Sequence, residues 1–547
     1  MVYNDNMVIK MSINKIKKIA KKILNEDIDI INSTYDTKNF SKSLKQFTDD
    51  NPSLLGEYSQ FGRRRDGKEF YHEIKKIEDG FYLLNKDLHE YDSPGFVLPN
   101  EIHTVRTGSP MRTKPFPMAR EYIIKMLLGK YLYQYPNIGG HVIARAHFVN
   151  YLIREGFQKD KTDNYDGLGV ENVVFACSTT HAFNMILSTI MRDEDVILVT
   201  GPNYGLFAVA PERMNGRVEV LDLEEEDDFY VNPNKLAKKI DEINKKLKQD
   251  FKGKLNYTPR VVAFLNMNPH NPLGKVMNKK NVEILKGIGD VCLEKGVFVI
   301  DDLIYRDLTY DQEDLALPLA TMSKYFNNTI TLIGLSKAYG LAGIRAGAIV
   351  APIPICKGIE EKIFTTMDSL PVLQVQAVAG AFNGTNRRYK MAKKYFKPII
   401  AEYQYRLELL KALISGIDVI NDNKTKNRII KEITKYASSS KMKTNILKGI
   451  AGVKLRNKTI PESGFFAVVD FTGLKGKTFK GQKITCEEDL VRYLYKTTKF
   501  KCIMGGNMSW PYEDEIIARF NYGIEIYDLI QEFEKLHQAL DVAEIWE

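Results

Sequence analysis

The stretch GLSKAYGLAGIRAGA, residues 334–348, places Lys337 directly after a run of apolar residues. A lysine in that position cannot easily extend its ammonium group to solvent, so burial should lower its pKa and favour an amine able to form an imine. Arg345 offers a fork of donors suited to a phosphate, and the glycines let the backbone pass close to a bulky ligand. By itself a lysine beside glycines is more often structural than catalytic. The surrounding sequence must therefore decide between the two interpretations.

The middle of the chain has the most regular organisation. Short apolar runs alternate with helix-like stretches such as 182–191 and 282–295, which predicts a parallel sheet covered by helices. In such sheets ligands bind beyond the carboxyl ends of the strands, so the polar residues after each run are candidates for chemistry. The runs are 173–176, 196–200, 261–265, 297–300, 329–335 and 348–350, and polar groups follow at 178–180, 201–204, 266–272, 301–305 and 336–337.

Three blocks in this region resemble those of the class I and II aminotransferases, which are pyridoxal 5′-phosphate (PLP) enzymes of fold type I. Residues 336–347 read S-K-x-x-G-L-x-G-x-R-x-G, similar to the family's cofactor-lysine signature. Residues 268–274 resemble the N-P-x-N-P-x-G block and residues 302–305 the D-x-x-Y block. The resemblance implies PLP as the cofactor. It also implies an α/β fold with two parts: a large domain whose mostly parallel central sheet is covered by helices, and a smaller α/β domain.

The resemblance assigns roles to four residues at the centre of the site. It implies that Lys337 carries the cofactor and that Asp302 keeps the pyridine nitrogen protonated. Asn271 and Tyr305 are expected to hydrogen-bond the phenolic oxygen, and Asn271 also borders the substrate. The physical chemistry agrees, because a carboxylate beside the ring nitrogen favours the protonated ring, which stabilises a carbanion at the substrate's α-carbon.

The expected phosphate site combines hydroxyl groups with a helix N-terminus. Ser178, Thr179 and Thr180 precede a helix expected to begin near residue 181, where free backbone N–H groups attract an anion. Ser336 and Arg345 complete the expected set of cofactor contacts.

The chain departs from the family pattern in this region and adds an aromatic residue. The glycine usual in the phosphate loop is missing, and Gly334 stands where a phosphate-binding hydroxyl is often found. Tyr204 resembles the aromatic residue that stacks on the cofactor ring, although a tyrosine after a strand often serves only in packing.

The remaining blocks concern the partner subunit and the substrate. Tyr135 lies in a segment similar to one from which a tyrosine reaches the partner's phosphate, so the resemblance implies a homodimer or a higher homo-oligomer with shared active sites. Residues 107–110, with Gly108, resemble a loop that closes on the substrate. Arg519 resembles the arginine that binds the substrate's α-carboxylate, and a bidentate guanidinium suits that group.

The resemblance also suggests a division of the chain. Residues 103–375 are expected to form the PLP-binding large domain, with their early part contributing to the small domain and the substrate loop. Residues 376–547 are expected to form the small domain, with a lysine-rich surface insertion near 420–460. Residues 1–102 are an N-terminal extension of unknown role.

Composition and charge limit which partners and which cellular location the chain is expected to have. The chain has 547 residues and a net charge of +9, which comes from lysines spread along its length, so we expect neither a nucleic-acid partner nor a membrane partner. The sequence has no apolar run of the roughly 18 residues needed to cross a bilayer, and a cytoplasmic location is expected. Five scattered cysteines without a CxxC pair predict neither a disulfide framework nor a metal site.

These features favour an aminotransferase that moves an amino group between an amino acid and a 2-oxo acid by a ping-pong mechanism. A PLP-dependent lyase, decarboxylase or synthase on the same fold is the alternative, because fold fixes the cofactor more firmly than the reaction. A non-catalytic PLP-binding regulator would need a helix-turn-helix in residues 1–100, and that region has no convincing pattern of this kind.

Overall fold

The larger of two sheets carries the strands that the sequence predicts. In the computed structural model its seven strands have the order β1-β7-β6-β5-β4-β2-β3. Neighbours from β3 to β6 run parallel, and β7 is antiparallel to both β1 and β6, so the predicted, mostly parallel sheet is confirmed. The strands are β1 (Val173–Ala176), β2 (Val196–Gly201), β3 (Arg217–Asp222), β4 (Val261–Met267), β5 (Phe298–Asp302), β6 (Thr329–Gly334) and β7 (Gly347–Val350).

The structure describes residues 105–106, 113–129, 132–162, 165 and 167–540. The expectations for the N-terminal extension 1–102 and for the loop 107–110 with Gly108 lie outside these residues.

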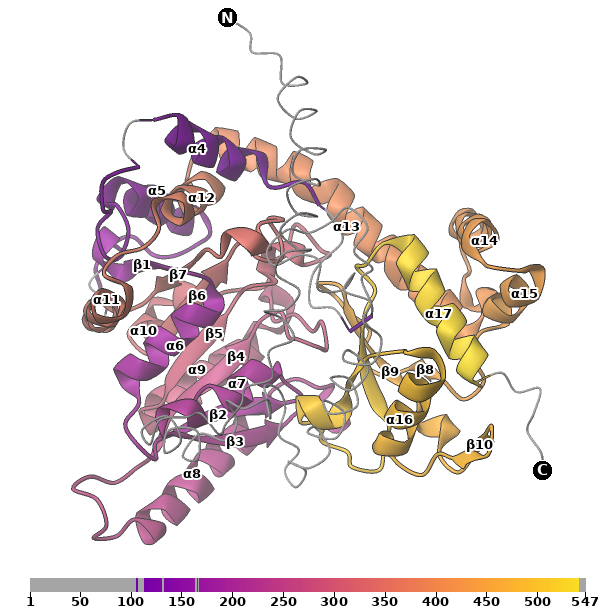
Figure 1. Cartoon of the computed structure of the whole chain (residues 1–547). Coiled ribbons are helices and arrows are strands. Elements are labelled where there is room, and N and C mark those ends of the chain that lie inside the picture. The colour runs from indigo at the N-terminus through magenta and orange to yellow at the C-terminus, as the bar shows by residue number, and fades with distance from the viewer. Residues whose placement is uncertain (1–104, 107–112, 130–131, 163–164, 166, 541–547) are drawn as a thin grey trace, which may run out of the picture. The chain divides into compact units, whose positions relative to one another are not determined.

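Helices cover both faces of the large sheet. Alternate residues of β2 point into different cores: Ile197 and Val199 join one, and Val196 and Leu198 join the other. The first core also receives α5, α6, α11 and α12, whereas the second receives α8 and α9. Figure 1 shows these helices around the sheet. The helices of this part are α4 (Pro117–Leu128), α5 (Val142–Arg154), α6 (Thr179–Ile190), α7 (Gly205–Val209), α8 (Pro233–Asp250), α9 (Val282–Lys295), α10 (Ser323–Phe326), α11 (Ile353–Met367) and α12 (Val372–Ala381).

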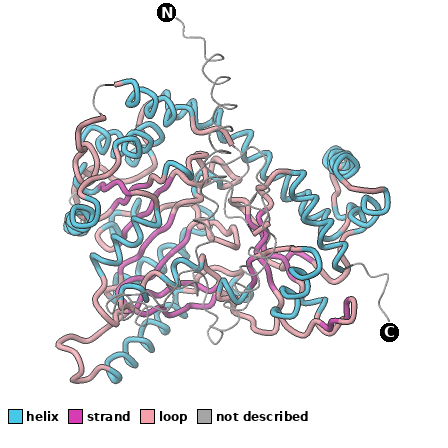
Figure 2. The backbone as a smooth tube through the Cα atoms, in the orientation of Figure 1, coloured by secondary structure: helices cyan, strands magenta, loops and turns pink. Residues whose placement is uncertain are grey.

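The C-terminal part has its own antiparallel sheet, with the order β12-β13-β9-β8. The long helix α13 runs from the helices beside the large sheet to the C-terminal helices, and Figure 2 shows the strands gathered in separate groups. The elements are α13 (Asn386–Ser415), α14 (Asn423–Tyr436), α15 (Ser440–Lys448), β8 (Lys454–Leu455), β9 (Phe466–Asp470), β10 (Thr478–Phe479), β11 (Gln482–Lys483), α16 (Glu487–Thr498), β12 (Ile503–Met504), β13 (Ile517–Asn521) and α17 (Ile526–Leu540).

Three details differ from the sequence-based expectations or extend them. Strand β3 was not predicted, because it is an edge strand that mixes charged and apolar residues. Helix α6 begins at Thr179, two residues before the expected start. The lysine-rich region forms α14 and α15, and α14 packs through the buried residues Ile429 and Ile433. Within the described residues, no helix has both the length and the apolar character needed to span a bilayer.

Candidate functional site

One pocket at the carboxyl ends of the large sheet's strands collects most of the predicted site residues. Its volume is about 160 Å³, several times the space that one buried water occupies. The parallel strands β2, β4, β5 and β6 all end at this edge, which is why segments far apart in sequence meet here. The lining residues are Thr179, Thr180, Tyr204, Leu206, Phe207, Met267, Pro269, Asn271, Asp302, Ile304, Tyr305, Ser336, Lys337, Arg345, Phe466 and Arg519.

Lys337 lies in the connection between β6 and β7, three residues after the last residue of β6. Burial, together with the positive charges of Arg519 and Arg345, lowers the pKa of its ammonium to about 8 against the opposing effect of Asp302. A pKa near 8 leaves a useful fraction of neutral amine near neutral pH, as a nucleophile or proton acceptor requires.

Asp302 and its neighbour Asp301 have different surroundings. Successive side chains of a strand point to opposite faces, and of the two only Asp302 lines the pocket. Asp301 accepts hydrogen bonds from the Asn266 side chain and from the backbone N–H of Leu319, both at 2.9 Å. Burial raises the pKa of Asp302 to about 7, although its Oδ1 accepts a hydrogen bond from the backbone N–H of Ile304. A positively charged ligand group beside Asp302 would therefore stabilise its carboxylate form and lower its pKa.

Arg519 reaches the pocket from the second sheet, on strand β13. It is only 4% exposed, and burial lowers the pKa of its guanidinium to about 10. Its Nη1 donates to Asn271 Oδ1 at 3.5 Å, and the guanidinium lies 4.1 Å from the ring centre of Phe466. Its Nε has no hydrogen-bond partner among the described residues. A buried guanidinium with an unused donor suits an anionic ligand group.

Tyr305 borders the pocket between the two sheets. Its ring packs edge-on against Phe465 and Phe466, and burial raises the pKa of its hydroxyl. The Ser463 hydroxyl donates to the Tyr305 carbonyl oxygen at 3.3 Å, and Ser463 also forms a β-bridge with Thr309. The segment after β5 is thus held by residues just before β9.

The loop before α6 places a serine in a backbone conformation typical of glycine. Ser178 has φ 88° and ψ 162°, a region that costs other residues on the order of 1–3 kcal/mol. Its hydroxyl accepts a hydrogen bond from the backbone N–H of His181 and so caps the helix. Ser178 is buried outside the set of pocket-lining residues, whereas Thr179 and Thr180 line the pocket at the N-terminus of α6. Ser178 therefore adopts the backbone conformation that a glycine in this loop would adopt.

The turn that carries Tyr204 is fixed by the C-terminal part of the chain. The backbone N–H of Asn203 donates to the Met508 carbonyl oxygen at 2.7 Å. A Cβ atom at Gly201 would lie 2.6 Å from the carbonyl oxygen of Ser509, so this close approach requires glycine. The Tyr204 ring meets Phe207 edge-on at 5.7 Å between centroids.

One predicted cofactor contact, Tyr135, lies outside the pocket. Tyr135 is 85% exposed and does not line the pocket. Arg145, from the same sequence block, forms an ion pair with Glu360 at 2.9 Å and donates to the Val173 carbonyl oxygen.

The sequence interpretation did not identify the apolar lining of the pocket or the contact of Arg519 with the N-terminal side. Met267, Pro269 and Ile304 stand inside or beside the recognised motifs, so their positions in those motifs were the available signal. Arg519 Nη2 donates to the Arg106 carbonyl oxygen at 3.4 Å. Arg106 directly precedes the predicted substrate loop, but nothing in its sequence context indicated this contact.

Comparison with protein families adds independent information. The family described as aminotransferase class I and II matches residues 109–426, which is more than half of the chain. An aspartate aminotransferase of Pyrococcus abyssi is 26% identical over 276 residues, which cover 50% of this chain and 62% of that protein. The cystathionine beta-lyase PatB of Bacillus subtilis is 30% identical over 184 residues, 33% of this chain and 42% of that protein. The chain thus spans about half the length of these curated relatives.

Comparison with solved structures supports the fold. The crystal structure of the aspartate aminotransferase from Rhizobium meliloti superposes with a TM-score of 0.62 and 16% sequence identity. The superposition covers 86% of this chain and 96% of that one. At this level of identity the likeness concerns the fold.

Proposed function

The chain belongs to the aminotransferase class I and II family, and from this premise we propose that it is a PLP-dependent aminotransferase acting on an amino acid and a 2-oxo acid. The observation that carries the proposal is the single pocket in which Lys337, Asp302 and Arg519 meet. An amine, a carboxyl group and a guanidinium are there held together by segments from two sheets.

The side chains of the pocket fit PLP by their chemistry. Arg345, the hydroxyls of Thr179, Thr180 and Ser336, and the N-terminus of α6 would hold the phosphate, with Ser178 supporting the loop. Asp302 would face the ring nitrogen, and Asn271 and Tyr305 would bind the phenolic oxygen. Tyr204 would stack on the ring. When bound, PLP supplies an aldehyde that captures an amino group and a ring that accepts electrons from the substrate's α-carbon.

The protein's own residues would then handle protons and orientation. The Nζ of Lys337 removes the α-proton of the substrate and later returns a proton, and its pKa of about 8 suits both directions. The carboxylate of Asp302 favours positive charge at the neighbouring ligand atom. The guanidinium of Arg519 binds the α-carboxylate and so orients the α-carbon toward Lys337.

A homodimer with shared active sites is part of the proposal, with Tyr135 reaching the partner's phosphate. It is supported by the exposed apolar side chains in the stretch of sequence that contains Tyr135, because exposed apolar surface often marks an interface with a partner. The group comprises Ile124, Leu127, Leu128, Leu132, Tyr133, Tyr135, Val142 and Ile143, each at least 45% exposed. We also propose a cytoplasmic location, which agrees with five cysteines that are all free.

A PLP-dependent lyase is the alternative function. It is favoured by the match to the cystathionine beta-lyase PatB, because lyases and transaminases share the first steps of PLP chemistry. The experiment that separates them is a half-reaction with single amino acids, followed by cofactor absorbance and analysis of products. An aminotransferase converts the cofactor stoichiometrically to its amine form and releases one equivalent of 2-oxo acid. Sustained turnover without an oxo-acid acceptor would identify a lyase or decarboxylase.

A further inference from the structure

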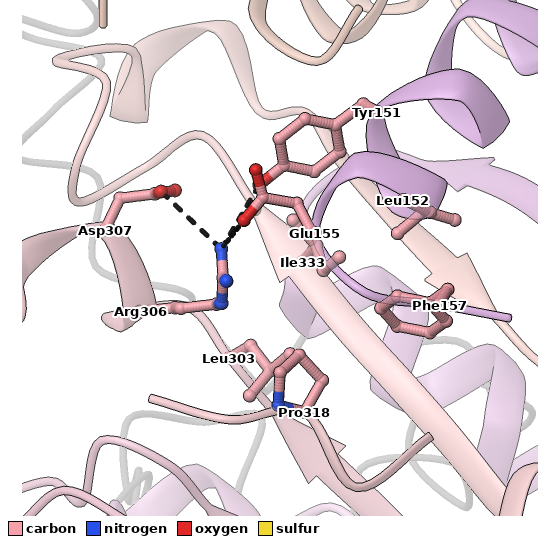
Figure 3. Close-up of a pocket in the computed structure, with 10 residues that line it drawn as sticks. Tyr151, Leu152, Glu155, Phe157, Leu303, Arg306, Asp307, Pro318 and Ile333 are labelled. Atoms are coloured by element: carbon pink, nitrogen blue, oxygen red, sulfur yellow. Dashed lines mark hydrogen bonds and ion pairs between the residues drawn. The ribbon is translucent and has the colours of Figure 1, made fainter. Parts of the chain in front are cut away.

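A network of largely buried charged and polar side chains includes residues that closely follow the pocket residues Tyr305 and Lys337 in sequence. We call it the Arg306 network, and it comprises Glu155, Arg306, Asp307, Tyr339 and Arg388. Arg306 Nη1 pairs with Glu155 Oε2 at 2.7 Å and lies 4.0 Å from Asp307 Oδ1. These three side chains are between 11% and 13% exposed, and Figure 3 shows them facing one another.

The network continues from Asp307 to the segment that carries Lys337. The Tyr339 hydroxyl donates to Asp307 Oδ2 at 2.8 Å and accepts from Arg388 Nη2 at 2.7 Å. Tyr339 is fully buried, and its ring packs edge-on against Phe116 and other aromatic rings. Arg388 lies in the first turn of α13, so the same network reaches the helix that leads to the C-terminal part.

The cavity beside the network is too small for a substrate. Its volume is about 10 Å³, which is about the space for one water molecule. Its walls include Glu155, Arg306 and Asp307 together with apolar side chains such as Leu152 and Phe157 (Figure 3). The charges of the network therefore face one another instead of a second ligand site.

We propose that Asp307 and Tyr339 are positioning residues that fix Lys337 and Tyr305 relative to each other. The inference rests on the proposed function of the pocket and deepens it. Tyr339 follows Lys337 by two residues, and Asp307 follows Tyr305 by two, so a single hydrogen bond ties the two segments that carry these pocket side chains.

Buried charged groups contribute little net stability when they hold two segments together, so we infer that the network's role is to fix their geometry. Burying an ion costs several kcal/mol unless excellent geometry compensates, and apolar residues often stabilise such a position as well or better. In exchange, a hydrogen-bonded buried network has one arrangement that satisfies all its members. Displacing a reacting group by about 1 Å can slow a reaction on the order of 100-fold.

The test uses Tyr339→Phe in the PLP-loaded enzyme, because this change removes the hydroxyl and keeps the aromatic packing. The matched control is Tyr325→Phe, which removes a hydrogen bond of the same kind and length, from the Tyr325 hydroxyl to Asp290 Oδ1 at 2.8 Å. Tyr325 does not line the pocket, and it lies in α10 before the start of β6, whereas Lys337 follows the end of β6. For each protein we would measure kcat, KM, the thermal midpoint and the pH midpoint of the bound cofactor's absorbance, which reports the surroundings of Lys337.

We expect Tyr339→Phe to lower kcat roughly 10- to 100-fold, with a smaller change in KM, and to move the absorbance midpoint by about half a pH unit or more. Tyr325→Phe should lower the thermal midpoint but keep the wild-type kcat and absorbance midpoint. If Tyr339→Phe behaves like Tyr325→Phe, the network is only structural and the proposal is overturned.

A second variant guards against a folding defect. Asp307→Asn keeps an oxygen that accepts from Tyr339 but removes the charge, and it should show a smaller change in the same direction. A wild-type kcat and absorbance midpoint in Asp307→Asn, with Tyr339→Phe unfolded, would also overturn the proposal. The absorbance midpoint needs bound PLP but no transamination, so this result stands apart from any failure of the proposed reaction.

Discussion

Two neighbouring groups of buried ionisable side chains respond to burial in opposite ways. In the pocket, burial is the largest cause of each shift: it raises the pKa of Asp302 to about 7 and lowers those of Lys337 and Arg519 to about 8 and about 10. At Glu155 and Arg306 in the Arg306 network, the neighbouring charges and hydrogen bonds together outweigh burial. There the pKa of Glu155 is lowered by Arg306 and by the Tyr389 hydroxyl, although burial acts in the other direction.

This difference in pKa shifts indicates which of the two groups binds a charged ligand. The network satisfies its charges internally and so holds one geometry. The pocket holds its groups in surroundings where an added charge of opposite sign would be strongly bound. Substitutions in the pocket should therefore affect ligand chemistry first, and substitutions in the network should affect geometry and stability first.

The largest expected effect is the loss of covalent cofactor attachment in Lys337→Ala. Without the amine, no side chain of the pocket can form the reducible linkage, so borohydride should fix no PLP to the variant. The measurement is the mass of the protein after reduction and dialysis. Cofactor fixed at the wild-type level in Lys337→Ala would show that another lysine carries it.

Asp302→Ala should slow α-proton removal by several orders of magnitude while leaving cofactor attachment intact. The neutral side chain no longer favours a protonated ring, so the carbanion loses its stabilisation. The rate of exchange of the substrate's α-proton into deuterated solvent measures this step.

Asp301→Asn is the matched control for Asp302, because Asp301 is buried on the same strand but does not line the pocket. It should lower stability and keep the exchange rate near that of the wild type. Exchange at the wild-type rate in Asp302→Ala would contradict the assigned role.

Arg519→Leu should lower kcat/KM for amino acids more than for other amines. Two charge-assisted hydrogen bonds to the α-carboxylate, each worth about 1.5–3 kcal/mol, imply a loss of roughly 100- to 10,000-fold in kcat/KM. For amines that lack the carboxylate, kcat/KM should fall much less. Equal losses for amino acids and their matched amines would indicate that Arg519 supports folding or the cofactor instead.

The sequence could predict the pocket because its residues stand in local motifs at strand ends. Lys337, Asp302 and Asn271 each follow a recognisable apolar run, and the parallel sheet brings such ends together. Helix α9 was predicted with its observed ends, because its apolar residues recur with helical periodicity and a glycine follows its last turn.

The parts that were not predicted depend on contacts between distant segments. Strand β3 mixes exposed charges with apolar residues at a sheet edge, so no apolar run marks it. The Arg306 network joins Glu155 directly after α5, the segment after β5, the β6–β7 connection and α13, and no local pattern links them. The positive φ of Ser178 is also not predictable from its sequence, since this conformation is typical of glycine and not of serine.

The smallest expected effect is a change in the free energy of unfolding of the cofactor-free protein. This change should have opposite signs for Lys337 of the pocket and Glu155 of the network. The folded pKa of Lys337, about 8, lies below the ordinary value, so folding disfavours the ammonium and this cost is fully present below pH 8. Lys337→Met should therefore raise the free energy of unfolding by on the order of 1–3 kcal/mol at pH 6.5, and the gain should shrink as pH rises toward 10. The pKa of Glu155 is lowered on folding, so its charge contributes stability at neutral pH that is lost as pH falls through the folded pKa. Glu155→Gln should destabilise the protein at pH 6.5. Urea unfolding of both variants at several pH values measures the two signs, and a loss of stability in Lys337→Met at pH 6.5 would show that the amine is part of the structural framework.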